Sequence, residues 1–196
     1  MFQTLVNVYT RREFIWKRIL GGGYSKEYEE EYADLVDKRV IEKFHKHTSN
    51  ANNFANLKTI FNKYFSEVFE EIKLQVDPGI ATSIFIEEHG FAESYEDSSR
   101  FLDIVNKDYP VCLISDADIE MVGPLLEKFK FDKVFISEEA KSYKKDSEGK
   151  IFKKVLDYYQ VEPEKIIHIG DSSSDIIGAS RVGIATCWIN RHDYSW

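Results

Sequence analysis

The feature that most constrains the fold is an alternation of apolar strands and amphipathic helices after residue 94. Short apolar runs predict buried strands at residues 110–114, 133–136, 165–169 and 184–189. Helical spacing of apolar residues predicts helices between them, through Phe101–Val105, Val122–Phe129, Ile151–Tyr159 and Asp175–Arg181. Repeated strand–helix units predict a parallel sheet with helices on both faces. The expected class is therefore α/β, with a doubly wound, Rossmann-like core.

The first half of the chain has another pattern, dense in Lys, Glu, Phe and Tyr with few β-branched runs. Four apolar stripes predict helices through Phe14–Ile19, Tyr28–Phe44, Leu57–Ile72 and, opened by Asp77, a segment up to His89. Gly21–Gly23 is a natural end for the first helix, and the polar residues Thr48–Asn53 separate the second from the third. We expect a helical bundle over residues 10–92 and the sheet domain over residues 93–196.

Composition limits the partners. The 196 residues include 26 Lys+Arg and 34 Asp+Glu, for a formal net charge of −8, and 43% are hydrophobic. This balance excludes a disordered chain and argues against nucleic acid or an anionic membrane as the main partner. No apolar run approaches the roughly 20 residues of a membrane span, and no leader pattern is visible, so we expect a cytoplasmic protein. Cys112 and Cys187 lie in apolar stretches typical of buried, reduced cysteines.

Polar residues follow two of the predicted strands, where ligands of parallel sheets gather. Ser115 and Asp116 follow the first, and a serine hydroxyl with the next N–H groups can hold an anion. Gly170 opens a serine-rich loop with Asp171 and Asp175, two carboxylates that suit Mg²⁺. Lys144, between them in sequence, could neutralise a phosphate. Each of these three features has an ordinary explanation when it is taken alone, as a turn, a helix cap or a solvated lysine. Their occurrence in this order is therefore a stronger indication of a binding site than any one of them.

That order resembles the second, third and fourth motifs of the haloacid dehalogenase superfamily, in its helical-cap, phosphatase- and dehalogenase-like branch. The similarity covers roughly residues 93–191; Lys145 departs from it, standing where a proline usually follows the lysine. The resemblance implies that Ser115 and the N–H of Asp116 hold the transferred group and that Lys144 neutralises its charge. It also implies a Mg²⁺ ion on Asp171 backed by Asp175, and a helical cap over residues 10–92 that selects the substrate.

Met1–Val6 is similar to the first motif of this family from its second position onward. The family's nucleophilic aspartate would then fall one residue before Met1, and residues 1–9 would be the remnant of that motif. Thr4 matches the motif threonine and joins the expected phosphate-binding residues. Phe2 takes the place of the second aspartate, so its carbonyl would bind the metal while its side chain has no proton to give. We expect the native protein to begin further upstream, the alternative being a sheet completed in another way.

The leading hypothesis is a Mg²⁺-dependent phosphatase that acts on a small phosphorylated metabolite through an aspartyl intermediate. One alternative is a non-catalytic binding or scaffold protein, because the sequence as given has no nucleophile; a homodimer would then cover the exposed sheet. Another is a metal-independent dehalogenase of small 2-haloacids, suggested by the non-acidic Phe2. His45 and His47 point to different faces of their predicted helix, and both are expected to be solvated.

Overall fold

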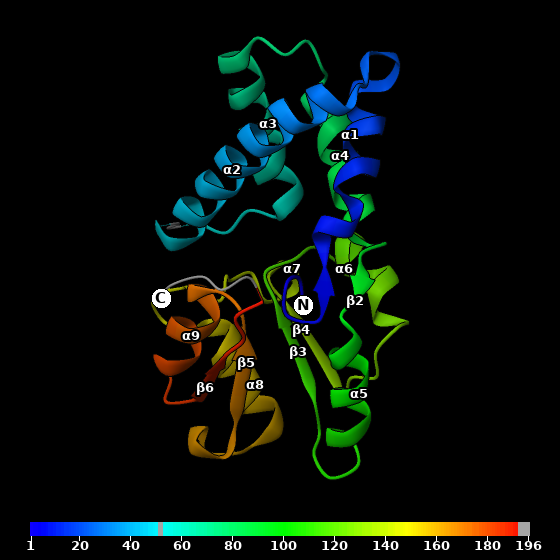
Figure 1. The fold of residues 1–196 in the computed structure, drawn as a ribbon. Helices are drawn as coiled ribbons and strands as arrows, with labels where there is room; N and C mark the ends of the chain where they lie inside the picture. Colours follow the sequence, from blue (N-terminus) through cyan, green and yellow to red (C-terminus); the bar gives the residue numbers. More distant parts are fainter. Residues whose placement is uncertain (51–52, 192–196) are drawn as a thin grey trace.

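The computed structural model describes residues 1–50 and 53–191, and Figure 1 shows a helical part above a part that contains the sheet strands. The helical part consists of α1 (Arg12–Leu20), α2 (Lys26–Asn50), α3 (Leu57–Ile72) and α4 (Pro78–His89). Short 3-10 turns, η1 (Val8–Arg11) and η2 (Gly21–Gly23), precede and follow α1. The four predicted helices are confirmed, while the domain limits at residues 9 and 92 stay predictions.

Local sequence explains where these helices begin and end. The Asp77 carboxylate accepts the N–H of Ile80 at 2.9 Å and so caps α4, which starts with Pro78 as predicted. Gly21 ends α1 with a positive φ of 53°. By contrast, α2 continues to Asn50, so the predicted polar break begins too early; Ala51 and Asn52 of that break lie outside the described residues.

The lower part contains short strands and five helices among the described residues. Its strands are β2 (Glu93–Ser94), β3 (Cys112–Ser115), β4 (Lys133–Ile136), β5 (Ile167–Gly170) and β6 (Ala185–Trp188), and its helices are α5 (Glu96–Val105), α6 (Ile119–Leu126), α7 (Ser137–Ala140), α8 (Lys150–Tyr159) and α9 (Ser173–Ser180), with a 3-10 turn η3 (Pro163–Lys165). An additional strand, β1 (Val6–Asn7), pairs antiparallel with β2 and joins the N-terminal turn to this part. The β1–β2 pair was not predicted, because two-residue strands carry no detectable period.

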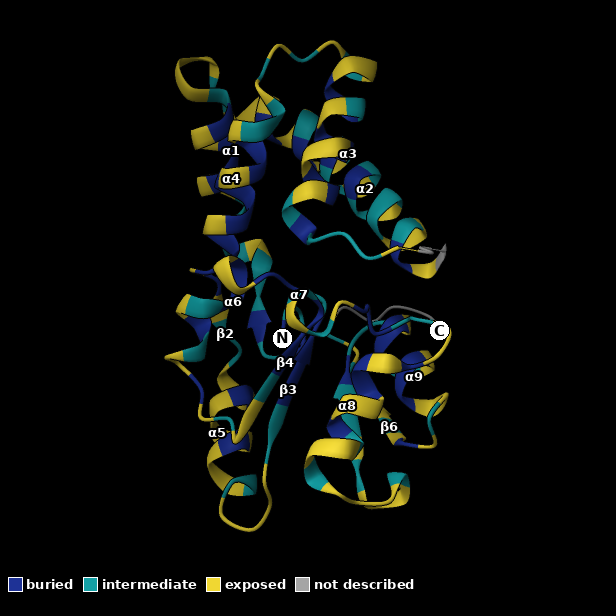
Figure 2. Ribbon diagram, turned by 180° about the vertical axis from the view of Figure 1, so that it is seen from behind, coloured by how far each residue is buried: buried dark blue, intermediate teal, exposed yellow. Residues whose placement is uncertain are grey.

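The parallel strands form two pairs. β3 is hydrogen-bonded to β4, and β5 to β6, both in parallel register, but the described residues form no ladder between β3 and β5. The α/β class and Rossmann-like core are therefore confirmed, whereas the continuous sheet that the alternation predicts is divided. Figure 2 shows the first pair more deeply buried than the second, in agreement with the exposed side chains of Ala185 and Cys187 on β6. The prediction that Cys187 is buried is wrong, and Cys112 is only partly buried.

One helix bridges the two pairs. Ile151, Phe152 and Val155 of α8 are each at most 1% exposed and form one apolar cluster with residues of β3, β4 and α9. Ile114 of β3 and Ile184, just before β6, belong to the same cluster. Because the ring of Phe152 also lies 5.1 Å from the ring of His168 on β5, α8 contacts both strand pairs. Nowhere in residues 1–50 and 53–191 does a helix combine the length and apolar character needed to cross a membrane.

Candidate active site

Lys144 is the centre of a buried charge cluster at the ends of the strands. It lies in the loop between α7 and α8, is 8% exposed, and its Nζ donates to Oδ1 of Asp175 at 2.5 Å. Burial by itself lowers the pKa of this lysine, but the carboxylates of Asp175 and Asp116 outweigh burial, and the net shift is upward. Lys144 therefore carries a positive charge at neutral pH, as an anion-binding group requires.

Asp175 holds Lys144 rather than facing outward. Its Oδ1 also accepts from Nε2 of His168 on β5 at 2.9 Å. Its Oδ2 accepts from the hydroxyl of Ser172 at 2.6 Å and from the N–H of Ser172 at 3.2 Å, which closes a capping box at the start of α9. Burial raises the pKa of Asp175, but the charge of Lys144 and the His168 hydrogen bond hold it well below its usual range. Both carboxylate oxygens are thus used within the protein.

Two glycines make this packing possible. A Cβ at Gly170 would lie 2.3 Å from Cγ of Asp175, and one at Gly178 would lie 2.1 Å from the carbonyl oxygen of Lys144. Both distances are shorter than van der Waals contact, so any larger residue would push the two sides of the charge cluster apart. Gly170 was singled out as a turn residue, whereas His168 and Gly178 were not assigned to the site.

Asp116 lies beside Lys144 after β3. Its Oδ1 accepts the backbone N–H of Lys144 at 2.8 Å and so ties the two loops together. Burial raises the pKa of Asp116 to about 6, against the opposing effect of the Lys144 charge. Ser115, the last residue of β3, is 3% exposed. The structure therefore brings Ser115, Asp116, Lys144 and Asp175 to one end of the sheet, as the sequence predicts.

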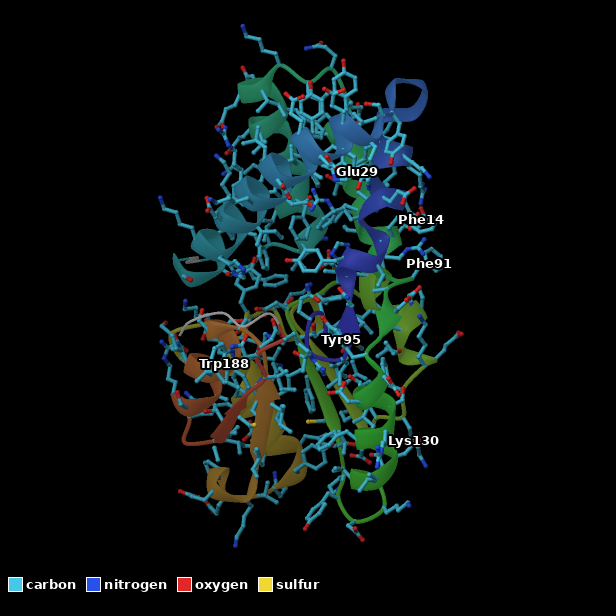
Figure 3. All side chains as sticks on the ribbon, in the orientation of Figure 1. Phe14, Glu29, Phe91, Tyr95, Lys130 and Trp188 are labelled. Atoms are coloured by element: carbon cyan, nitrogen blue, oxygen red, sulfur yellow. The ribbon has the colours of Figure 1, made fainter. Side chains whose placement is uncertain are left out.

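Thr4 binds Asp171 directly. The hydroxyl of Thr4 donates to Oδ1 of Asp171 at 2.6 Å, which joins the N-terminal turn to the loop after β5. Trp188 of β6 donates its indole N–H to the carbonyl of Asp171 at 2.9 Å, and Tyr95 donates to Oε1 of Gln3 at 2.9 Å; Figure 3 labels both aromatic residues. The role of Thr4 in phosphate binding stays a prediction, because its hydroxyl hydrogen is directed at Asp171 here.

The N-terminal turn brings the main chain of Met1 into the charge cluster. The N–H groups of Leu5 and Val6 donate to the carbonyl of Met1 at 2.8 and 3.3 Å, which closes the turn. The main-chain nitrogen of Met1 is buried and within electrostatic reach of Asp116, Lys144, Asp171 and Asp175. The first residue of the described chain therefore belongs to the same electrostatic surroundings as the Lys144–Asp175 pair.

The predicted metal ligands differ in how well they fit a cation. Asp175 is already occupied by Lys144, His168 and Ser172. One carboxylate oxygen of Asp171 accepts a hydrogen bond from the hydroxyl of Thr4. The two hydrogen bonds of the β-bridge between Phe2 and Val6 use the carbonyl of Met1 and the N–H of Gln3, so neither involves the carbonyl of Phe2. Among the described residues, no three His, Cys, Asp or Glu side chains gather as a metal cage. A Mg²⁺ ion on Asp171 and the Phe2 carbonyl stays a prediction.

The helical part is fastened to the loops that carry the site. Asp118, which follows β3, accepts the N–H groups of Leu57 and Lys58 at 2.9 and 2.8 Å and thereby caps α3. The hydroxyl of Tyr143, the neighbour of Lys144, donates to the carbonyl of Ala55 at 2.6 Å and accepts its N–H at 3.1 Å. Asp118 is also the N-cap residue of α6, but it makes no side-chain hydrogen bond to that helix, because its carboxylate binds α3 instead.

The two histidines near the end of α2 differ in burial. His45 is exposed to solvent, as expected. His47 is half-buried, and its Nδ1 shares a hydrogen bond with the hydroxyl of Tyr64 at 3.1 Å. The expectation that both histidines are solvated is therefore met only by His45.

Comparisons with known proteins concern the family and the fold of the chain. A family model described as haloacid dehalogenase-like hydrolase matches residues 4–183. A dehalogenase crystallised as an intermediate complex superposes with a TM-score of 0.76 at 19% identity, covering 99% of this chain and 84% of that one. An L-2-haloacid dehalogenase from Xanthobacter autotrophicus gives 0.77 at 14% identity, covering 98% and 76%. The HAD-hydrolase YfnB from Bacillus subtilis, bound to magnesium, gives 0.79 at 14% identity, covering 97% and 86%. No curated protein matches the chain.

Proposed function

Because this chain belongs to the haloacid dehalogenase-like hydrolases, we propose that it hydrolyses a small phosphorylated metabolite through an acyl-phosphate intermediate on an aspartate. One observation carries the proposal. The main-chain nitrogen of Met1 is buried and interacts electrostatically with Lys144, Asp175, Asp171 and Asp116. An aspartate directly before Met1, where the family pattern has its nucleophile, would place its carboxylate among these groups.

The residues of the chain then have separate roles. The hydroxyl of Ser115 and the N–H of Asp116 hold the phosphoryl oxygens, and the charged Lys144 stabilises the negative charge that develops on them. Asp175 and His168 keep Lys144 in position. Asp171 and the carbonyl of Phe2 would hold Mg²⁺, which supplies further charge neutralisation when bound.

The reaction runs in two displacements. A carboxylate oxygen attacks phosphorus, the bond to the leaving alkoxide breaks, and the alkoxide takes a proton from water because Phe2 has none to give. Water then attacks phosphorus of the acyl phosphate and loses a proton to the hydroxide left by the first step, which releases inorganic phosphate and restores the carboxylate. Lys144 faces the phosphoryl group in both steps.

The test compares the chain from Met1 with a form extended by the codons directly upstream in its gene. We expect phosphate release from p-nitrophenyl phosphate in Mg²⁺ only from the extended form. Replacing the aspartate before Met1 by Asn should lower kcat at least about 10³-fold, a loss typical of a missing nucleophile. The proposal would be overturned if both forms turned over equally or if neither form turned over. It would also be overturned if the codon directly before Met1 encoded a residue without a carboxylate. Binding without turnover would favour the scaffold alternative.

The second candidate is a metal-independent 2-haloacid dehalogenase. Phe2 favours it, because a halide leaves without a proton, and so does Asp175, whose oxygens are already used by Lys144, His168 and Ser172. The same two forms of the protein should be given 2-chloropropionate with EDTA present. Chloride release by the extended form, with no phosphate release in Mg²⁺, would select this candidate over the phosphatase.

A further inference from the structure

The strand β4 has a groove beside it. In the part of the chain that the structure describes, β4 is hydrogen-bonded to β3 only, so no strand pairs with its other side. The groove has a volume of about 430 Å³ and is lined by residues of β4, α7 and α8, without any residue of β3. The main-chain N–H and C=O groups on an unpaired strand edge can bind a further strand. The edge of β4 is therefore a place where a second chain can extend the strand pair.

Along this groove, α8 runs in the direction opposite to β4. The hydroxyl of Tyr159, at the end of α8, donates to Oδ2 of Asp132, directly before β4, at 2.7 Å. The ring of Tyr158 lies 5.8 Å from the ring of Phe135, and Nζ of Lys133 lies 5.6 Å from the centre of the Tyr158 ring. The last turn of α8 is therefore beside the start of β4, and the earlier turns lie toward the end of the strand.

Four exposed charges line the groove, and their signs alternate in a regular way. Lys133 at the start of β4 is positive, and Glu139 of α7, which follows the end of β4, is negative. On α8 the order is reversed, because Asp157 lies near the start of β4 and Lys154, one turn earlier in the helix, lies toward its end. Among the described residues none of these four side chains forms an ion pair.

We propose that this edge is the interface between two copies of the chain, in which β4 pairs antiparallel with β4 of the partner subunit about a two-fold axis. Such an axis brings the start of one strand to the end of the other. Lys133 then faces Glu139 of the partner subunit, and Lys154 faces Asp157 of the partner subunit, each pair occurring twice. A parallel arrangement would place like charges together instead, which opposes association.

The charge pattern thus identifies a second copy as the occupant of the groove. The pairing also covers the ring of Tyr158, which is 52% exposed in the single chain. The inference goes beyond the proposed function and does not depend on it, because the interface requires neither a nucleophile nor a bound anion.

The test measures the mass of the full chain in solution by sedimentation equilibrium. We expect the unmodified protein to form a dimer of two 22.9 kDa chains. Lys133→Glu and Glu139→Lys each place two like charges opposite one another, so each should raise the dissociation constant of the dimer at least about ten-fold. Lys38→Glu, an equal change of charge at an exposed position of α2, should leave the dissociation constant unchanged.

An equimolar mixture of the two single variants tests the two-fold arrangement itself. In a mixed dimer every reversed charge again faces an opposite charge, so the mixture should associate as tightly as the unmodified protein. The double variant Lys133→Glu, Glu139→Lys should form a dimer by itself for the same reason. Circular dichroism checks that the single variants keep the fold, and the double variant decides if one of them does not.

Three results would overturn the proposal. The first is an unmodified protein that stays monomeric at every concentration measured. The second is a dimer that neither charge reversal weakens, because another surface would then hold it together. The third is the absence of association both in the mixture of folded single variants and in the double variant.

Discussion

The centre of the helical part, residues 12–89, is an apolar cluster, whereas the centre of the candidate site in the strand-containing part is a charged pair. In α3 the buried side chains are Leu57, Ile60, Phe61, Tyr64, Phe65, Val68 and Phe69, and they meet apolar residues of the other helices. At the ends of β3 and β5 the buried groups include Lys144 and Asp175, a charged pair. Apolar burial contributes stability directly, whereas a buried pair offsets its own desolvation only if every partner is present. The helical part is therefore expected to tolerate polar changes at its surface, and the site to depend on complete pairing.

The largest effect is expected at the centre of the helical core. Phe65 is 1% exposed and its ring lies 5.4 Å from Phe69 and 5.6 Å from Phe85. Phe65→Ala should lower the free energy of unfolding by about 4 kcal/mol, from lost burial and the cavity left behind. Urea denaturation measures this change. Ile80→Ala on α4, at a position 61% exposed, should cost less than about 0.5 kcal/mol, and similar losses in both variants would contradict the comparison.

Breaking the buried Lys144–Asp175 pair should lower the free energy of unfolding slightly less than the Phe65 substitution does. Asp175→Ala leaves Lys144 and His168 without their acceptor and should lower the free energy of unfolding by about 3 kcal/mol. A double variant with Lys144→Met should recover part of that loss, because no unpaired charge remains. Equal stability of the single and double variants in urea would show that the pair is not coupled.

The Lys144–Asp175 pair also makes the free energy of unfolding depend on pH. The pKa of Asp175 is depressed in the folded protein, so its contribution is present above its unfolded pKa of about 3.9 and disappears as the pH falls through the folded pKa. The difference in stability between the unmodified protein and Asp175→Ala should therefore be constant near neutrality and shrink in acid. A difference that grows as the pH falls would contradict this assignment.

Asp116 should affect the pH dependence of the free energy of unfolding in the opposite direction. Its pKa is raised to about 6, above the unfolded value of about 3.9, so the folded state holds the proton more tightly. The stability of the unmodified protein should fall as the pH rises between these values. Asp116→Asn removes that slope and should stabilise the protein by about 2 kcal/mol at pH 7.5 but little at pH 4. Thermal melting at the two pH values measures this difference. An equal rise of the melting temperature at both pH values would contradict the raised pKa of Asp116.

The smallest effect is expected at an exposed ion pair between the two parts. Lys58 of α3 donates to Oε2 of Glu120 on α6 at 2.8 Å, and both side chains are about half exposed. Lys58→Ala should change the free energy of unfolding by less than about 0.5 kcal/mol, because solvent screens the pair. A loss above about 1 kcal/mol in urea would mean that this contact fastens the helical part to the loops.

Much of the site was predictable because its residues stand next to recognisable strands. Ser115 and Gly170 end β3 and β5, and their loops carry Asp116 and Asp171 as expected. The partner of Asp175 was not predictable: Lys144 is 31 residues away, and only packing decides that its Nζ reaches this carboxylate. His168 was interpreted as a strand residue, and no local signal shows that its ring turns toward Asp175.

The amino-acid sequence by itself determined the kinds of elements, because hydrophobic period and capping residues act within a few positions. It also determined the order of polar residues at the strand ends, from which the family was identified. Tertiary structure alone decided that the parallel strands form two pairs, that Asp118 binds the first N–H groups of a helix in the other part, and that Lys144 reaches Asp175. These outcomes depend on contacts between distant residues, whose geometry follows from packing and is not encoded in any local pattern.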